Sequence, residues 1–315
     1  MKHVFLIDPD AFLGQQWRMD GLLDMIGQHF RTQEKPDFTT VVSKFPREAI
    51  GIVQKQVSEA DGDTVRVYAV GGDGILFDCL NAIVGLPNME LAVIPYGTAN
   101  TFLRSFGEGK ADAFRNIASI TSAPAIPTDV IEAGNTHAIM GCAVGFTPAV
   151  VIRVRELDAA KAAKRLRRFT AGLRRFFTGL FFIFDRGIVA RQYKITIDEV
   201  DYSGTYSLVN IINGPYFGRK KTALVDARLD DGFLDVVLLK SSSLLGTLHN
   251  FRKYSAGKLP SGCIRIQAKK VEMQSDKPMC IQTDSEYIMD TSITFEVVPK
   301  AVQVVAVDNL TYQGY

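Results

Sequence analysis

The stretch AVGGDGILFDCL, residues 69–80, decides how the first part of the chain folds. An apolar run ends in two glycines, an aspartate and a third glycine, and apolar residues then return at helical spacing. This pattern predicts a strand, a tight turn over residues 71–74 and a helix from about Ile75. In an open α/β sheet such a turn lies at the carboxyl edge, which is where ligands bind.

The glycines of this turn suit a phosphate group, because bare backbone amides can approach it closely and a helix N-terminus attracts its charge. Asp73 would repel a bare phosphate. Either a divalent cation lies between the two, or the carboxylate holds a hydroxyl or a loop amide instead. A tight strand-to-helix connection without any ligand is the competing interpretation.

A second turn of the same kind follows in VIPYGTANTFLRSFG, residues 93–107. Here a strand leads to Gly97, and Thr98 and Asn100 stand at the expected start of a helix. These two side chains either cap that helix or face the same ligand as the first turn. Two neighbouring strands that end in polar glycine turns predict one binding site.

The rest of the chain indicates two domains. Residues 3–95 alternate strand-like and helix-like stretches, which predicts an α/β domain with a mostly parallel sheet. Beyond about residue 128 short runs of alternating polar and apolar residues predict an antiparallel sandwich or barrel-like sheet. We place the boundary in the proline-containing segment 122–128, giving domains 1–127 and 128–315, with a last strand or tail that could return to the first domain.

Composition excludes several classes of protein. The 315 residues are 47% hydrophobic and carry a formal net charge of +2, so a large core is expected and no global field draws the chain to nucleic acid. The apolar run at the N-terminus is too short for a secretory signal, and no stretch is long enough to span a bilayer, so we expect a cytoplasmic protein. The four cysteines match no zinc-ligand spacing and are expected as buried free thiols.

Four blocks of sequence, in order, resemble the diacylglycerol kinase catalytic-domain family, which includes sphingosine kinases. They are GGDGI, PYGTANTFLR, NIINGPYFGRKKTALVDARLDDGFLDVVLL and IQTDSEYI, and PTDVIEAGNTHAIMGCAVGFTPAVV resembles the family's domain crossing. The resemblance implies a Rossmann-like (NAD kinase-like) α/β N-terminal domain, a β-rich antiparallel sandwich domain and an active site in the cleft between them. It implies transfer of the γ-phosphoryl group of ATP to a lipid hydroxyl, with diacylglycerol or a related lipid alcohol as acceptor.

The resemblance also implies roles for individual residues. A structural magnesium ion would be held by Asp231 and by the main-chain carbonyls of Arg228 and Phe233. Glu286 would accept the substrate proton, with Asp284 second and Asp73 also in the catalytic set. The residues implied to bind ATP are Gly71, Gly72, Asp73, Gly74, Ile75, Gly97, Thr98, Asn100 and, less directly, Ser43.

Asp284 and Glu286 are two residues apart, and on an extended strand both side chains would point the same way, toward the cleft. The alternative is a polar β-turn on the surface, because Asp-Ser is favourable turn chemistry. Phosphoryl transfer needs positioning, cations and a proton acceptor, and either carboxylate could serve the last two needs.

Four positions depart from the family pattern. Ile75 replaces a threonine, Thr101 an aspartate, Ser285 a glycine, and Asp8 an asparagine that begins the family's first loop. A lost hydroxyl beside a phosphate weakens nucleotide binding without abolishing it. Two alternatives to a lipid kinase therefore stay open: a member that binds nucleotide or lipid without turnover, and a kinase of a soluble acceptor, since NAD kinases share the first glycine turn.

The segment AAKAAKRLRRFTAGLRRFFTGLFFIF, residues 159–184, predicts an amphipathic helix with seven Lys or Arg residues and a stripe of leucine and phenylalanine. Such a helix either meets anionic lipid headgroups at a membrane surface or packs on the sheet with a solvated basic face. The sequence is silent on oligomeric state, and a homodimer stays open.

Overall fold

The computed structural model describes residues 1–34, 37–43, 48–60, 62–146, 148–149, 152, 191–217, 220–221, 224, 226–240 and 244–312. The basic segment 159–184 lies outside these residues. In the first domain, strands and helices alternate as the sequence predicts. The strands are β1 (Lys2–Ile7), β2 (Phe38–Val42), β3 (Val65–Gly71) and β4 (Met89–Pro95), and the helices are α1 (Gln16–Arg31), α2 (Glu48–Ser58) and α3 (Asp73–Ile83).

These four strands form a parallel sheet in the order β4-β3-β1-β2. Strand β3 is buried along its whole length, and Val4, Phe5, Leu6 and Ile7 of β1 are fully buried. Strands covered on both faces need continuous apolar runs, which is the pattern that the sequence shows here. All four carboxyl ends therefore lie at one edge of the sheet.

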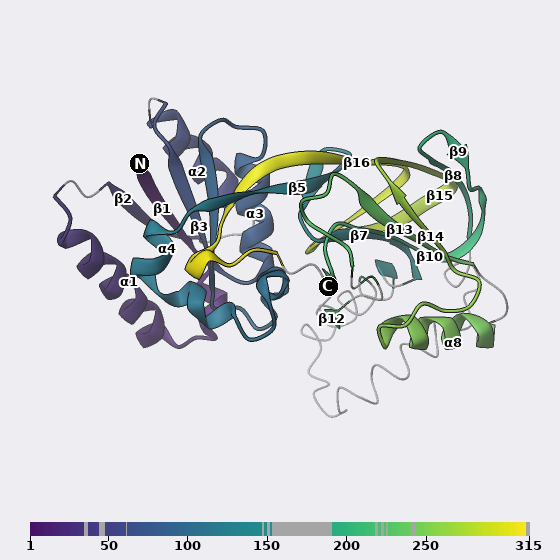
Figure 1. Cartoon of the computed structure of the whole chain (residues 1–315), viewed down its shortest axis with the longest axis horizontal. Helices are drawn as coiled ribbons and strands as arrows, with labels where there is room; N and C mark the ends of the chain where they lie inside the picture. Colours follow the sequence, from purple (N-terminus) through teal and green to yellow (C-terminus); the bar gives the residue numbers. More distant parts are fainter. Residues whose placement is uncertain are drawn as a thin grey trace, which may run out of the picture.

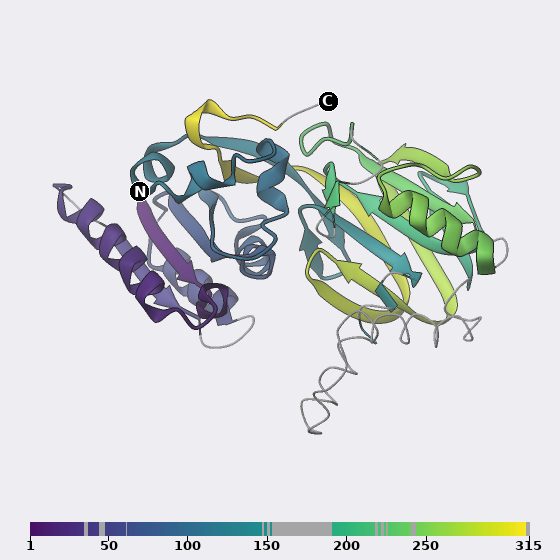
Figure 2. The same ribbon diagram turned by 90° about the horizontal axis from the view of Figure 1, so that it is seen from below.

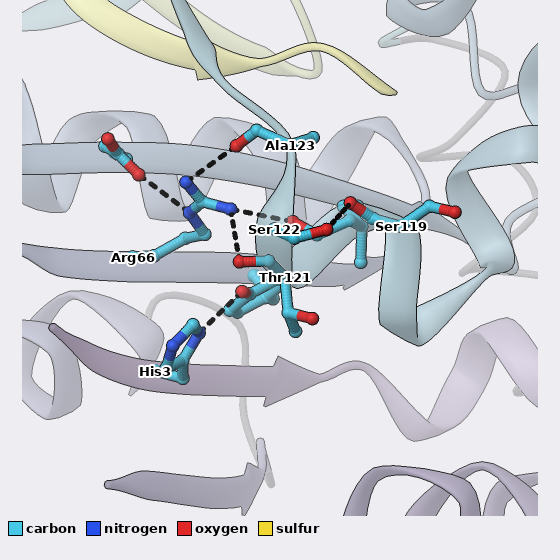
Figure 3. Close-up of polar contacts among 9 residues, drawn as sticks. His3, Arg66, Ser119, Thr121, Ser122 and Ala123 are labelled. Carbon is cyan, nitrogen blue, oxygen red and sulfur yellow. Dashed lines mark hydrogen bonds and ion pairs between the residues drawn. The ribbon is translucent and has the colours of Figure 1, made fainter. Parts of the chain in front are cut away.

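Short helices and a buried arginine complete this domain. They are η1 (Pro9–Phe12), η2 (Phe102–Phe106), η3 (Ala111–Arg115) and α4 (Ile117–Ser122). The Arg66 guanidinium donates to the carbonyl oxygens of Ile120, Thr121 and Ala123 at the end of α4, at 2.8 to 2.9 Å. Figure 3 shows Arg66 beside Thr121 and Ala123. Its Nε also pairs with Glu90 at 2.7 Å. The arginine satisfies carbonyls that the helix end leaves without partners.

The second domain is an antiparallel assembly with a separate hydrophobic core. Of its cysteines, Cys142 and Cys280 are buried and Cys263 is half-buried; Cys79 of the first domain is buried too, and all four are free. Its elements are β6 (Thr136–Ala138), β7 (Gly141–Gly145), β8 (Arg191–Ile197), β9 (Val200–Asp201), β10 (Gly204–Ile212), β11 (Tyr216–Phe217), β12 (Lys220–Lys221), β13 (Leu234–Lys240), α8 (Leu244–Ser255), β14 (Ile264–Ala268) and β15 (Lys270–Thr283).

Two long strands carry the chain between the domains, β5 (Ala125–Ala133) and β16 (Glu286–Val305). They run side by side as the bridge seen in Figures 1 and 2, and they pair antiparallel from Phe295↔Ala133 to Val305↔Ala125. The first part of β16 pairs with β15, and its last part pairs parallel with β4. The segment 122–128 thus contains the end of α4 and the start of β5, and η4 (Val307–Asn309) follows β16.

None of the described helices is both long and apolar enough to cross a membrane.

Candidate active site

The two glycine turns touch each other. The backbone N–H groups of Tyr96 and Gly97 both donate to the carbonyl oxygen of Gly71, at 3.0 and 2.9 Å. A Cβ atom placed on Gly97 would overlap the Cα of Gly72 and lie 2.9 Å from its nitrogen. Glycine is required at position 97 because the two backbones approach more closely than any side chain allows.

Helix α3 begins in this contact region. Its N-cap is Gly72, and no side chain caps the first turn. The carboxylate oxygen Oδ1 of Asp73 accepts a hydrogen bond from the backbone N–H of Thr101 at 2.8 Å. One of the roles expected for Asp73 was to hold a loop amide, and the structure shows this hydrogen bond. The bond joins the second turn to the first. The uncapped amides of α3 retain the capacity to bind an anion.

The remaining residues expected at the nucleotide site lie at or near the same edge. The Ser43 N–H donates to the Ile7 carbonyl at 2.9 Å, which extends the pairing of β2 with β1. Thr98 is exposed, whereas Ile75 is 6% exposed and belongs to the core, so only its backbone is available to a ligand.

The side chains of Thr98 and Asn100 do not cap a helix. The N-cap of η2 is Thr101, without a side-chain hydrogen bond. Asn100 Nδ2 donates to the Gly97 carbonyl at 2.8 Å, and its buried Oδ1 has no hydrogen-bond partner among the described residues. Asn100 therefore shapes the second turn itself, and its Oδ1 is an acceptor that remains available there.

The expectation that Asp284 and Glu286 share an extended strand is wrong. Strand β15 ends at Thr283 and β16 begins at Glu286. Thr283 pairs with Glu286, and residues 284–285 form the turn between the two strands. Asp284 has a positive φ of 45°, which aspartate tolerates better than most residues. The turn is not a polar surface feature either, because Asp284 is 7% exposed, while Glu286 beside it is half-buried.

The Asp284 carboxylate is held by the segment between β6 and β7. Oδ2 accepts from the N–H of Ile139 at 2.7 Å, and Oδ1 accepts from Met140 and Gly141 at 3.1 and 2.9 Å. Burial raises the pKa of this carboxyl to about 7, the three N–H donors oppose the rise, and the negative charge of Asp73 adds to it. The charge of Asp73 is therefore near enough to act on Asp284, although the two residues are far apart in sequence.

A second contact joins the domains beside this pair. The Asn81 side chain of α3 accepts from the His137 N–H at 2.7 Å and donates to the His137 carbonyl at 3.0 Å. Asn81 thus bonds to β6 as another strand would. Helix α3, which begins at the first glycine turn, is fixed against the sandwich domain at its other end.

The loop expected to hold magnesium forms a separate acidic group. Asp231 Oδ1 accepts from the Phe233 N–H at 3.0 Å, while the Arg228 side chain turns to Asp230 at 3.0 Å. Burial raises the pKa of Asp231, and the carboxylates of Asp235, Asp129 and Asp230 raise it further. Among the described residues, no three His, Cys, Asp or Glu side chains are grouped to hold a metal ion. A site of one carboxylate and two carbonyls stays a prediction.

Sequence reasoning missed two buried polar residues that connect these groups. Asp129 of β5 accepts from the N–H of Gly232 at 2.7 Å and from that of Lys300 at 2.8 Å, which fastens the acidic loop to an irregularity in β16. Asn213 Nδ2 donates to the carbonyls of Asp129 and Ile139 at 2.8 and 2.9 Å. The available signal was an aspartate within one strand and an asparagine directly after another, because a buried polar group must find partners.

Comparison with known proteins agrees with this architecture. Residues 5–133 match the diacylglycerol kinase catalytic domain, and residues 158–306 match the YegS C-terminal NAD kinase beta sandwich-like domain. The chain belongs to the diacylglycerol kinase catalytic-domain family. A protein of Shewanella frigidimarina named "Probable lipid kinase YegS-like" is 30% identical over 264 residues, which cover 80% of each chain.

The fold has a counterpart among solved structures. A crystal structure of a diacylglycerol kinase from Bacillus anthracis superposes with a TM-score of 0.69 and covers 98% of both chains, at 21% sequence identity. The two chains share the whole fold, including the sandwich domain.

Proposed function

We propose that this protein is an ATP-dependent lipid kinase that transfers the γ-phosphoryl group to the hydroxyl of a lipid alcohol, with diacylglycerol as the first candidate. The proposal depends above all on the close contact of the two glycine turns and on Asn81 of α3, which bonds to His137 of the domain that carries Glu286. Phosphoryl transfer requires a phosphate-binding element and a proton acceptor at one place. The names of the relatives support the same class of activity.

The glycine turns fit a triphosphate. Close contact between Gly72 and Gly97 keeps side chains away from the turn, and the first amides of α3 have no side-chain cap. In this proposal Gly71, Gly72, Gly74 and Gly97 bind the phosphates through their backbone, together with the backbone of Ile75. Thr98, Asn100 and Ser43 contribute polar groups around them.

Magnesium fits the acidic loop by charge. Neighbouring carboxylates destabilise the ionised form of Asp231, and a divalent cation would relieve that repulsion. In this proposal Asp231 holds the ion together with the carbonyl oxygens of Arg228 and Phe233. The ion would be structural there, since its positive charge would hold the acidic loop together.

Glu286 is the residue we assign to proton acceptance. It is half-buried at the first position of β16, next to the turn that approaches Asp73. The Asp284 carboxylate is buried and engaged by three backbone donors, so we assign it to holding this turn rather than to the second catalytic role expected from the sequence. General-base catalysis by a positioned carboxylate contributes about 100-fold or more.

The test is phosphoryl transfer from labelled ATP to mixed micelles of diacylglycerol, compared with NAD as acceptor. Wild-type protein is expected to phosphorylate the lipid, and Glu286→Gln is expected to lose about 100-fold or more of kcat. Glu296→Gln is the matched control, because Glu296 is an exposed carboxylate on the same strand. Turnover with NAD alone, or nucleotide binding without transfer to any lipid alcohol, would overturn the proposal.

A further inference from the structure

Asp8 follows the last residue of β1 and lies against the first glycine turn. Its backbone N–H donates to the carbonyl of Val70 at 2.9 Å, so it is level with the end of β3. A Cβ atom on Gly71 would lie 2.9 Å from Asp8 Cβ and 3.4 Å from Asp8 Oδ2. The glycine at position 71 makes room for the aspartate, whose carboxylate borders the turn.

Among the described residues, the Asp8 carboxylate contacts backbone N–H groups at the start of η1, those of Asp10 and Ala11. Oδ1 accepts from the Asp10 N–H at 3.0 Å, which caps η1. Asp8 forms no ion pair with any residue that the structure describes, and the group is half-buried. A half-buried carboxylate gains from hydrogen-bond donors and is repelled by phosphate. The ligand group that reaches Asp8 should therefore be a neutral donor.

The order of strands fixes which end of a nucleotide can reach Asp8. The sheet runs β16-β4-β3-β1-β2, so the sandwich domain joins it on the side of β4. The reacting phosphate must approach Glu286 in the sandwich domain, and α3, the helix that follows β3, bonds to that domain through Asn81 and His137. The other end of the nucleotide therefore extends toward β1 and β2, where Asp8 and Ser43 stand. The donors that follow the phosphates in ATP are the ribose hydroxyls.

We propose that the Asp8 carboxylate accepts hydrogen bonds from the ribose hydroxyls of the nucleotide and so selects ribonucleotides over deoxyribonucleotides. Acidic residues serve this purpose in dinucleotide-binding sheets, where they hold a ribose beside a glycine turn. The inference rests on the proposed function, because it requires a nucleotide at this edge. It gives a role to an aspartate that replaces a neutral amide.

The experiment is calorimetric titration in the presence of magnesium with ATP, 2′-deoxy-ATP, 3′-deoxy-ATP and inorganic tripolyphosphate. Wild-type protein is expected to bind ATP about 10-fold more tightly than at least one deoxynucleotide. This is the effect expected from the loss of one hydrogen bond between a ribose hydroxyl and a charged carboxylate. In Asp8→Ala this preference should shrink to about twofold or less, with tripolyphosphate binding undiminished. Asp8→Asn should keep part of the preference, because its amide oxygen still accepts. Asp24→Asn, at an exposed aspartate of α1, should behave as wild type.

Equal affinity of wild-type protein for ATP and both deoxynucleotides would overturn this inference and leave the kinase proposal standing. Loss of tripolyphosphate binding in Asp8→Ala would overturn it as well, because Asp8 would then act on the phosphates. Absence of any nucleotide binding would overturn both proposals. The wild-type nucleotide series needs no variant, so the inference remains testable even if Asp8→Ala does not fold.

Discussion

Replacement of Asp284 by asparagine tests how this buried carboxylate holds the β15–β16 turn. Asparagine keeps one acceptor oxygen, and its amide group faces backbone N–H donors that have lost their partner. A buried N–H group without a partner costs about 1 to 3 kcal/mol. We therefore expect Asp284→Asn to lower the free energy of unfolding by about that amount or more at acidic pH, measured by urea denaturation.

The pH dependence of this loss follows from the pKa of Asp284. Burial raises it from 3.8 to about 7 in the folded protein, so the folded state holds the proton more tightly than the unfolded state between these values. The stability that this provides is present below about pH 4 and is lost as pH rises to about 7. At up to 1.36 kcal/mol per pH unit, and with half of the groups already ionised at pH 7, wild-type protein should lose about 2 kcal/mol between pH 5 and pH 7 from this group. The asparagine variant should lack that slope.

The assay compares wild-type protein, Asp284→Asn and Asp276→Asn at pH 5, 6, 7 and 8 at constant ionic strength. Asp276 is an exposed aspartate of β15, the strand that leads into this turn, and its replacement should change stability by less than about 0.5 kcal/mol. The stability difference between wild-type protein and Asp284→Asn should shrink as pH rises. A difference that grows with pH would refute the reasoning, since it would mean that the three N–H donors outweigh burial.

Two further substitutions test the packing around the site. Gly97→Ala forces a Cβ into the backbone of Gly72, so it should lower the free energy of unfolding by about 1 to 3 kcal/mol and weaken ATP binding. Gly21→Ala, in open space on α1, should leave ATP binding intact. Equal ATP affinity of the two variants would contradict the close contact of the turns. In Arg66→Lys, the single ammonium group cannot replace the forked guanidinium that reaches both Glu90 and the end of α4. This variant should lower the free energy of unfolding by about 3 kcal/mol. A change below about 0.5 kcal/mol in chemical denaturation would show that the contacts are not cooperative.

Much of the first domain could be predicted from local pattern. Apolar runs that end in Gly71 and Gly97 mark strand ends, and both runs are strands in the structure. Period and glycine placement are properties of neighbouring residues, so they can be read without knowledge of the fold. The contact between the two turns was expected only in outline, because the approach of Gly72 to Gly97 depends on the pairing of β3 with β4.

The acidic pair shows where local pattern fails. Residues 284 and 286 are two apart, as are residues that face the same side of a strand. A continuous strand and a two-residue turn between two strands therefore give similar sequence patterns here. The positive φ of Asp284 and its burial against residues 139–141 decide between the two. Neither can be derived from IQTDSEYI alone, since the partners of Asp284 lie more than 140 residues away.

By itself, the sequence determined the kinds of strand and helix, the two glycine turns and the family to which the chain belongs. Only the tertiary structure decided what surrounds each aspartate: the N–H groups of residues 139–141 around Asp284, Gly71 beside Asp8, and the acidic loop at Asp129. The physical reason is that backbone preference acts between neighbours in sequence, whereas burial and Coulomb interaction act between neighbours in space. The protonation state of a carboxylate, and with it a role in binding or catalysis, is set by the second kind of neighbour.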